Sequence, residues 1–195
     1  MRLIFATNNK HKVEEIKAAL TGSLEVVSLN DAGIEIEIPE PHETLEDNAK
    51  EKGKTIFSIT KQNCFSEDTG LEATALNGGP GVHSARYAGE EHSSEKNIAK
   101  LLSSLENHTN RKAQFRTVIF LLLNGKEYYF EGVCKGQITL EPKGNSGFGY
   151  DPVFVPDGSD KTFGQMDLTE KNIYSHRKKA LDKLVTFLNQ HSINS

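Results

Sequence analysis

The sequence predicts a mixed α/β domain, and two features of the chain support that prediction. An apolar run at residues 2–6 is followed by a polar loop and then by apolar residues at helical spacing, which is the order of a strand, a loop and a helix. Asn124-Gly125 lies between two strand-like runs, 117–123 and 126–133, and such a pair is the strongest local signal for an antiparallel hairpin. The sheet should therefore contain both parallel and antiparallel neighbours.

The first part of the chain is expected to form a βαβ unit. Val13, Ile16 and Leu20 form the apolar stripe of the first helix, and Gly22 is a stop signal for it. Residues 25–29 then have the pattern of a second buried strand.

Three further helices are expected. One covers residues 44–59 and opens at Thr44, where Asp47 stands three residues later in place of the usual Glu or Gln of a capping box. Apolar stripes predict the other two over residues 95–105 and 175–189.

The composition is that of an ordinary globular protein. The 195 residues are 36% hydrophobic and 26% charged, and they suffice for one large domain or for two small lobes. The net charge of −4 gives no general attraction to nucleic acid or to an anionic membrane, and the longest apolar run, 118–123, is far too short to span one. Cys64 and Cys134 are too few for a disulfide framework. We therefore expect a cytoplasmic protein without nucleic-acid or membrane partners.

The loop before the first helix is a candidate phosphate site. Its polar residues are Thr7, Asn8, Asn9, Lys10, His11 and Lys12. Free backbone N–H groups at a helix N-terminus favour anions, whereas lysine in a first turn opposes the helix dipole unless an anion binds there. An ordinary solvated helix start is the alternative. A P-loop is excluded, because its Gly-Lys-Ser/Thr ending is missing.

Glu67 and Asp68 are candidate metal ligands, since paired carboxylates suit Mg²⁺. We expect them where an extended segment breaks into a glycine-rich turn at residues 77–82. A second acidic group precedes them, and most of its members should face water: Glu35, Glu37, Glu40, Glu43, Glu46 and Asp47. One or two of these could join Asp68 around a metal, but their spacing does not choose among them.

The segment Phe148-Gly149-Tyr150-Asp151 is a candidate nucleobase site. An aromatic ring can stack on a base, and an aspartate can accept hydrogen bonds from base N–H groups. A turn with core aromatics is the alternative interpretation.

Basic residues near the last helix could also contact a base. Lys171 precedes it, and His176 and Arg177 at its start could donate to a purine carbonyl. Alternatively, Ser175 is a helix N-cap and the next two residues lie at the surface. The seven histidines show no metal-ligand spacing, which argues against zinc.

Taken together, these segments resemble the nonstandard purine nucleoside triphosphate pyrophosphatases, also called inosine triphosphate pyrophosphatases, nearly from end to end. The matching segments follow the family's order and span residues 5–12, 40–49, 67–71, 80–89, 147–152 and 170–177. The first is similar to the family's Thr-x-Asn-x-x-Lys loop, and the second to its glutamate-containing metal stretch that runs into an Asn-Ala helix.

The resemblance implies hydrolysis of inosine, deoxyinosine and xanthosine triphosphates (ITP, dITP and XTP) to the monophosphate and pyrophosphate. It also implies Mg²⁺, a homodimer with residues 80–89 as a candidate interface, and a single domain over residues 1–195. The implied fold is an elongated twisted sheet flanked by helices, with two lobes around a central nucleotide cleft.

The resemblance also implies a role for each matching residue. Glu40 and Asp68 would hold the metal, and Asp68 would be the base for water. The triphosphate would be held by Thr7, Asn9, Lys12, Lys52 and Thr69. The purine would be bounded by Phe148, Asp151, Lys171, His176 and Arg177.

Some positions depart from the commonest bacterial pattern, and two other functions are considered. Glu67-Asp68-Thr69 replaces an Asp-Asp-Ser triplet, Asp47 stands where Glu is more usual, and His83 replaces a residue more often aromatic or apolar. Asp68-Thr69-Gly70 is also the aspartic-protease triplet, but such enzymes need two copies and this chain has one. A nucleotide sensor without turnover could use the same loop and aromatic pocket.

Overall fold

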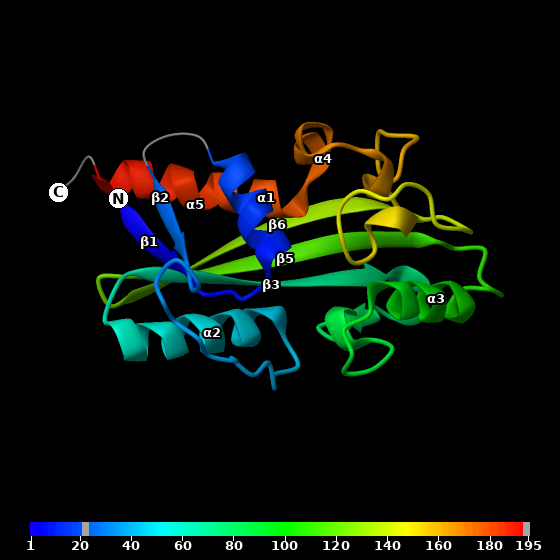
Figure 1. The fold of residues 1–195 in the computed structure, drawn as a ribbon. Coiled ribbons are helices and arrows are strands. Elements are labelled where there is room, and N and C mark those ends of the chain that lie inside the picture. Colours follow the sequence, from blue (N-terminus) through cyan, green and yellow to red (C-terminus); the bar gives the residue numbers. More distant parts are fainter. Residues whose placement is uncertain (21–23, 193–195) are drawn as a thin grey trace. The chain divides into compact units, whose positions relative to one another are not determined.

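The computed structural model describes residues 1–20 and 24–192, whose strands form one mixed sheet (Figure 1). Its strand order is β2-β1-β3-β5-β6-β7, with β4 beside β3. The strands are β1 Arg2–Phe5, β2 Glu25–Ser28, β3 Cys64–Ala73, β4 Pro80–Gly81, β5 Lys112–Leu123, β6 Lys126–Ile138 and β7 Phe154–Pro156. The helices are α1 Lys10–Ala19, α2 Leu45–Thr60, α3 Ser94–Ser104, α4 Leu168–Tyr174 and α5 His176–Ser192. β1 pairs in parallel with β2 and β3, whereas β3–β4 and β6–β7 are antiparallel, so the predicted mixed sheet is confirmed.

The predicted hairpin is also confirmed. It joins β5 to β6, and Asn124 and Gly125 both have positive φ, 50° and 76°. Turns of this kind match the twist of the two strands that they connect.

One predicted boundary is corrected. The extended segment that holds Glu67 and Asp68 does not break after them, because β3 continues to Ala73 and pairs there with β4. Gly70 is required for this close pairing rather than for a turn, since a Cβ atom there would lie 2.5 Å from the carbonyl oxygen of Gly81.

One helix was not expected, and the end of another was only partly testable. α4 is a helix that the sequence did not predict. α1 ends at Ala19, and the expected stop signal at Gly22 lies outside the described residues.

The chain divides into two compact units. Unit 1 takes Met1–Asp68, Thr117–Gly132 and the chain from Arg177 onward, and unit 2 takes Thr69–Arg116 and Val133–His176. Each unit contains part of the predicted site, and each is described by itself below.

Unit 1 has three layers, because alternate residues of its strands face opposite sides of the sheet. Leu3 and Phe5 on β1 pack with α1 and α5, whereas Ile4 packs with α2. Along β5 the side chains alternate in the same way. Ile119 and Leu121 pack on the side of α1 and α5, and the residues next to them pack on the side of α2. In Figure 1, α1 and α5 lie on one side of the strands and α2 on the other.

Unit 2 is built around one apolar core that joins α3 to β3, β5 and the segment after β6. Ile98 and Leu101 on α3 belong to it, together with Phe115, Phe154 and Phe163. The three phenylalanine rings contact one another, with centroids 4.7 to 6.1 Å apart. No helix within the described part of the chain has both the length and the apolarity needed to cross a membrane.

Candidate active site

The loop before α1 caps the helix with its own side chains. Asn9 is the N-cap, and its side-chain oxygen accepts from the backbone N–H of Lys12 at 3.1 Å. Thr7 accepts from the N–H of Asn9 at 3.2 Å, and the Asn8 amide donates to the carbonyl of Ile36 at 2.7 Å. No acidic residue lies in the first turn of α1. The positive end of the helix dipole and the lysines at this end can therefore attract an anion.

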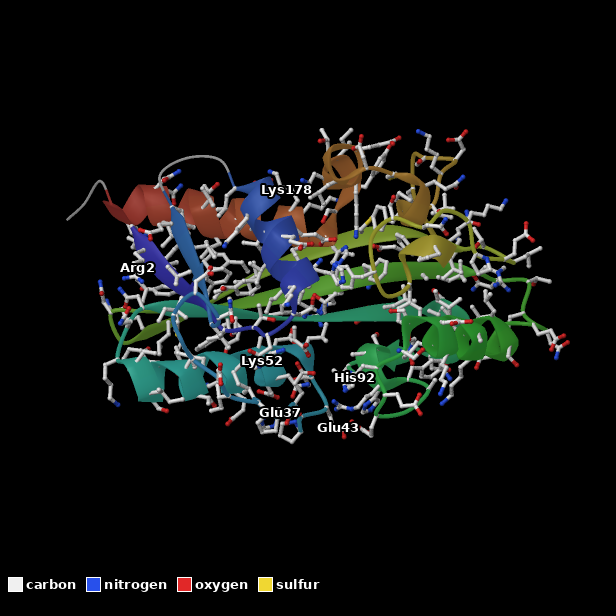
Figure 2. The ribbon with its side chains drawn as sticks, viewed as in Figure 1. Arg2, Glu37, Glu43, Lys52, His92 and Lys178 are labelled. Atoms are coloured by element: carbon white, nitrogen blue, oxygen red, sulfur yellow. The ribbon has the colours of Figure 1, made fainter. Side chains whose placement is uncertain are left out.

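Two carboxylates and one ammonium group meet where α2, β3 and the loop before α2 approach one another. Lys52 is buried on the side of α2 that faces the sheet (Figure 2). Its Nζ donates to Glu40 Oε1 at 2.6 Å and to Asp68 Oδ1 at 3.1 Å. Asp68 is 4% exposed, whereas the Glu40 side chain is 28% exposed. The two carboxylates thus converge on a single cation position at the edge of solvent.

The charges at this position shift the pKa values of Asp68 and Lys52. Burial raises the pKa of Asp68, and the nearby Glu40 adds to this, while the charges of Lys52 and Lys12 act in the opposite direction. Burial lowers the pKa of Lys52, but the charges of Asp68 and Glu40 outweigh it, so that the pKa ends above its ordinary value. Lys52 therefore remains an ammonium ion at neutral pH.

The geometry fits Mg²⁺ held by two protein carboxylates. Within the described ranges, no cluster of three or more His, Cys, Asp or Glu side chains could hold a metal alone. Mg²⁺ does not need such a cluster, because it is commonly bound by one or two carboxylates together with water and substrate phosphates. Glu40 and Asp68 already share one cation, which in this structure is the ammonium group of Lys52.

Glu67 lies beside Asp68 on β3 but belongs to a different charge network. Its two oxygens lie 3.0 and 2.9 Å from Arg177 Nε, and Lys12 Nζ is 3.2 Å from one of them. Arg177 is also paired with Glu15 of α1. Burial raises the pKa of Glu67, but the charges of Arg177 and Lys12 outweigh it and lower that pKa to about 2. Glu67 is therefore an ionised member of a buried network.

The predicted nucleobase residues of unit 2 lie together. Lys171 Nζ donates to Asp151 Oδ2 at 2.6 Å and lies 5.3 Å from the ring centroid of Phe148 and 5.2 Å from that of Phe163. Asp151 also accepts from the backbone N–H of Phe148 at 2.9 Å. A charged group between two rings can support stacking of a flat ligand and hydrogen bonding at its edge.

The His176 ring lies beside this group, with its centroid 6.5 Å from that of Phe163. It is 2% exposed and stacks on Phe115, with centroids 4.7 Å apart and an interplanar angle of 11°. Arg177, the next residue, is also 2% exposed. The alternative that both are surface residues of a helix start is wrong. Arg177, which is also predicted to bound the purine, forms ion pairs with two carboxylates, those of Glu67 and Glu15.

The remaining predicted residues have simpler surroundings. Asp47 is exposed and accepts from the Thr44 hydroxyl at 2.7 Å, so it stabilises the start of α2. Lys10 and His11 are exposed on the first turn of α1. Glu35 and Glu37 face water, as expected.

Three further predicted residues lie in unit 2. Thr69 is half-buried on β3. Tyr150 is buried and donates to the carbonyl of Ser84 at 2.8 Å, and the neighbouring Gly149 has a positive φ of 61°.

Two participating residues, Glu15 and Asn48, were assigned no role from the sequence, although Asn48 lies in the matching segment 40–49. A usable signal exists for Asn48, because the buried face of α2 consists of Leu45, Asn48, Ala49, Lys52, Gly53 and Ile56. Two polar side chains on an otherwise apolar helical stripe indicate partners in the interior. Glu15 gives no comparable signal, because its partner Arg177 is 162 residues away in the chain.

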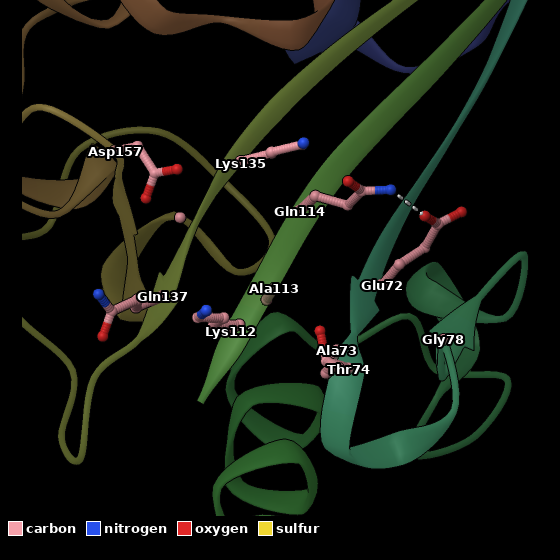
Figure 3. A pocket seen from close by; sticks show the side chains of 11 residues that line it. Glu72, Ala73, Thr74, Gly78, Lys112, Ala113, Gln114, Lys135, Gln137 and Asp157 are labelled. Atoms are coloured by element: carbon pink, nitrogen blue, oxygen red, sulfur yellow. Dashed lines mark hydrogen bonds between the residues drawn. The ribbon is translucent and has the colours of Figure 1, made fainter. Parts of the chain in front are cut away.

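A cavity of about 490 Å³ lies elsewhere, on the sheet of unit 2 (Figure 3). Glu72 on β3 and Gln114 on β5 are joined there by a hydrogen bond of 2.7 Å, and Lys112, Lys135 and Asp157 also line it. None of the described residues that line this cavity is among those predicted for the site. We therefore keep it apart from the candidate active site.

Comparisons with known proteins agree with the resemblance seen in the sequence. The model of the Ham1 family matches residues 3–187. The dITP/XTP pyrophosphatase of Flavobacterium johnsoniae is 48% identical over 96% of this chain and 98% of its own length, and that of Porphyromonas gingivalis is 46% identical over 96% and 97%. The structure of the Staphylococcus aureus Ham1 protein has a TM-score of 0.88 and 36% identity over 98% of this chain and 100% of its own. This chain belongs to the Ham1 family.

Proposed function

We propose that this protein hydrolyses the nonstandard purine nucleoside triphosphates ITP, dITP and XTP to the monophosphate and pyrophosphate, and so removes them from the nucleotide pool. The observation that carries the proposal is the convergence of Glu40 and Asp68 on one cation position, occupied by Lys52 Nζ at 2.6 and 3.1 Å. The relatives named dITP/XTP pyrophosphatase at 43–48% identity support the choice of substrate class.

In this proposal Glu40 and Asp68 hold Mg²⁺. Mg²⁺ held there would supply positive charge to offset the negative charge of the phosphate oxygens while water attacks the α-phosphorus. Lys52 keeps its positive charge and can stabilise the negative triphosphate.

Asp68 is the proposed base that takes the proton of the attacking water. Asp68 lies at the cation position, so its carboxylate stands where it could orient and deprotonate a water beside the phosphates. A positioned general base typically contributes about 10²- to 10⁴-fold to the rate.

The triphosphate is proposed to bind at the N-terminal end of α1. Thr7 and Asn9 shape the loop there, and Lys12 supplies charge close to Glu67. Asn8, Lys10 and His11 complete the loop, and Lys52 and Thr69 complete the proposed triphosphate contacts.

The purine is proposed to stack on Phe148, with Asp151, Lys171 and His176 at its edge. A donor at the purine 6-position suits the carbonyl of inosine or xanthosine and opposes the amino group of adenine, because a buried donor left unpaired is costly. His176 is the first candidate for this donor, since the Arg177 guanidinium is engaged by Glu67 and Glu15.

The two rival functions receive less support. Asp68 of the protease-like triplet contacts the ammonium group of Lys52 rather than sharing a proton with a second aspartate. A sensor without turnover would need neither a base nor a second carboxylate at the cation position. The homodimer, the cytoplasmic location and the single domain with a central cleft remain predictions, and light scattering on the purified protein would test the first.

The proposed function is tested by incubating the protein with ITP and Mg²⁺ and measuring pyrophosphate. Wild type should release inosine monophosphate and pyrophosphate, and Asp68→Asn should lose about 10²-fold or more in kcat. Asp31→Asn is a suitable control, because Asp31 is an exposed partner of Lys17 away from the predicted residues. Wild-type turnover by Asp68→Asn would remove Asp68 from the mechanism. Tight ITP binding without pyrophosphate would favour the sensor.

A further inference from the structure

The side chain of Asn48 on α2 forms two hydrogen bonds with the backbone of one residue, His42, in the loop before the helix. The Asn48 side chain is fully buried. The oxygen Oδ1 accepts from the backbone N–H of His42 at 2.9 Å, and Nδ2 donates to the carbonyl of the same residue at 3.1 Å. This pair of hydrogen bonds fixes the backbone two residues after Glu40.

The same side chain reaches Asp68. Asn48 Nδ2 lies 3.4 Å from Asp68 Oδ2, while the other oxygen, Oδ1, accepts from Lys52 Nζ at 3.1 Å. Asn48 and Lys52 are four residues apart, so they project from the same face of α2. Consecutive turns of one helix thus hold the two oxygens of a single carboxylate.

The two contacts differ in what happens when a metal ion arrives. Lys52 is a cation in the position on which Glu40 and Asp68 converge, so a divalent cation there competes with it. The Asn48 amide is neutral and does not compete for that position. Its hydrogen bonds can persist and keep both carboxylates oriented after Lys52 gives way.

The helix that carries Asn48 is itself fixed on the sheet. The Ser66 hydroxyl donates to the carbonyl of Ala49, and the Cys64 thiol lies 3.3 Å from the carbonyl of Gly53. Both contacts join α2 to β3, the strand that carries Asp68. Asn48 therefore connects the loop that carries Glu40 with the strand that carries Asp68, and it does so from a helix that is itself hydrogen-bonded to that strand.

We propose that Asn48 is a positioning residue that sets the placement of Glu40 and Asp68 and so determines the affinity for the divalent cation. The inference rests on the proposed function, because it concerns the same two carboxylates. Neighbours that orient metal ligands typically change metal affinity or activity by about 10- to 100-fold when they are removed.

Asn97 provides a matched control in unit 2. It is 4% exposed on α3, its Oδ1 accepts from the backbone N–H of Ala88 at 2.6 Å, and its Nδ2 donates to the carbonyl of Ala85 at 2.9 Å. Asn97→Ala thus removes a similar pair of loop contacts, both of them to backbone groups rather than to a carboxylate.

The test compares wild type, Asn48→Ala and Asn97→Ala by thermal unfolding and by titration with Mn²⁺ in the absence of nucleotide, followed by paramagnetic resonance. Both variants should lose thermal stability. Asn48→Ala alone should bind Mn²⁺ about 10- to 100-fold more weakly. If Asn48→Ala does not fold, Asn48→Ser is measured in its place with the same expectation.

Unchanged Mn²⁺ affinity in a folded Asn48 variant would overturn the proposal and leave the residue a purely structural role. Failure of wild type to bind Mn²⁺ would overturn it as well, since there would be no metal site to position. Pyrophosphate release from ITP is measured separately. Absence of that activity with intact, Asn48-dependent Mn²⁺ binding would refute the proposed function and not the role of Asn48.

Discussion

Lys52 places a buried positive charge between Glu40 and Asp68, and its removal should affect metal binding and turnover in opposite directions. Without the ammonium group, two carboxylates face one another without a counter-ion, which is unfavourable in a buried site. A divalent cation would relieve that repulsion. The triphosphate, in contrast, would lose a stabilising charge.

We therefore expect Lys52→Gln to bind Mn²⁺ more tightly than wild type and to hydrolyse ITP about 10²-fold more slowly. The metal titration and steady-state kinetics measure the two effects. Lys54→Gln is the control, because Lys54 is half-exposed and pairs with Glu127. Weaker Mn²⁺ binding by Lys52→Gln would show that the lysine does not compete with the cation.

Glu67 should contribute stability that depends on pH. Its pKa in the folded protein is about 2, against an ordinary value of 4.5, so its ionised form favours the folded state. This contribution is complete above about pH 4.5 and is lost as the pH falls from there toward 2.

Glu67→Gln should lower the free energy of unfolding by about 3 kcal/mol at pH 7, since it breaks a buried ion pair. Urea denaturation at several pH values measures the difference from wild type, which should shrink below pH 4.5. A difference that stays constant down to pH 2 would contradict the depressed pKa.

At the scale of elements, the approach of α2 to the sheet depends on Gly53. A Cβ atom there would lie 2.4 Å from Cδ1 of the Phe120 ring on β5 and 3.1 Å from the Ser66 hydroxyl. The ring belongs to the core that α2 shares with the sheet, so the helix or the ring would have to move.

Gly53→Ala should therefore destabilise the protein by about 1–3 kcal/mol. The sign of the change in stability is informative, because helix propensity alone would make alanine more stable than glycine in a helix interior by about 1 kcal/mol. Urea denaturation of Gly53→Ala beside Ser58→Ala, an exposed position on the same helix, measures it. A stabilised Gly53→Ala would mean that α2 packs less closely than the structure indicates.

Local sequence signals predicted which helices and strands exist better than they predicted the residues at which these begin and end. The Asn124-Gly125 hairpin and the stripe of α5 could be read directly, because turn chemistry and helical periodicity depend on neighbours in sequence. The extension of β3 beyond Asp68 could not, since it depends on pairing with β4. α4 has only seven residues and gives too short a pattern to recognise.

The same distinction applies to the site. Asp68 and Lys171 could be proposed from their motifs, whereas the partners of Arg177 could not. Glu67 and Arg177 are 110 residues apart, and nothing in either local segment indicates that they meet. Long-range ion pairs of this kind are set by the fold and not by sequence spacing.

At the scale of the whole molecule, the residues proposed for the phosphates and those proposed for the base belong mainly to different units. Unit 1 carries the carboxylates and the N-terminus of α1, and unit 2 carries the ring and lysine group around Phe148. Chemistry on the phosphates and recognition of the base would then be separable by mutation.

Selectivity tests the contribution of unit 2. Wild type should show a kcat/KM for ITP about 10²-fold or more above that for adenosine triphosphate, because a donor aimed at the 6-position is left unpaired by adenine. Asp68→Asn should lower both values and leave their ratio unchanged. Equal rates on the two nucleotides would contradict the proposed recognition of the purine.

The central claim is that water attacks the α-phosphorus of a nonstandard purine nucleoside triphosphate. Hydrolysis of ITP by wild type with Mg²⁺ in ¹⁸O-labelled water, followed by mass spectrometry of both products, tests it most directly. The label should appear in inosine monophosphate, and the pyrophosphate should be unlabelled. Label in pyrophosphate, or release of orthophosphate and inosine diphosphate, would contradict it.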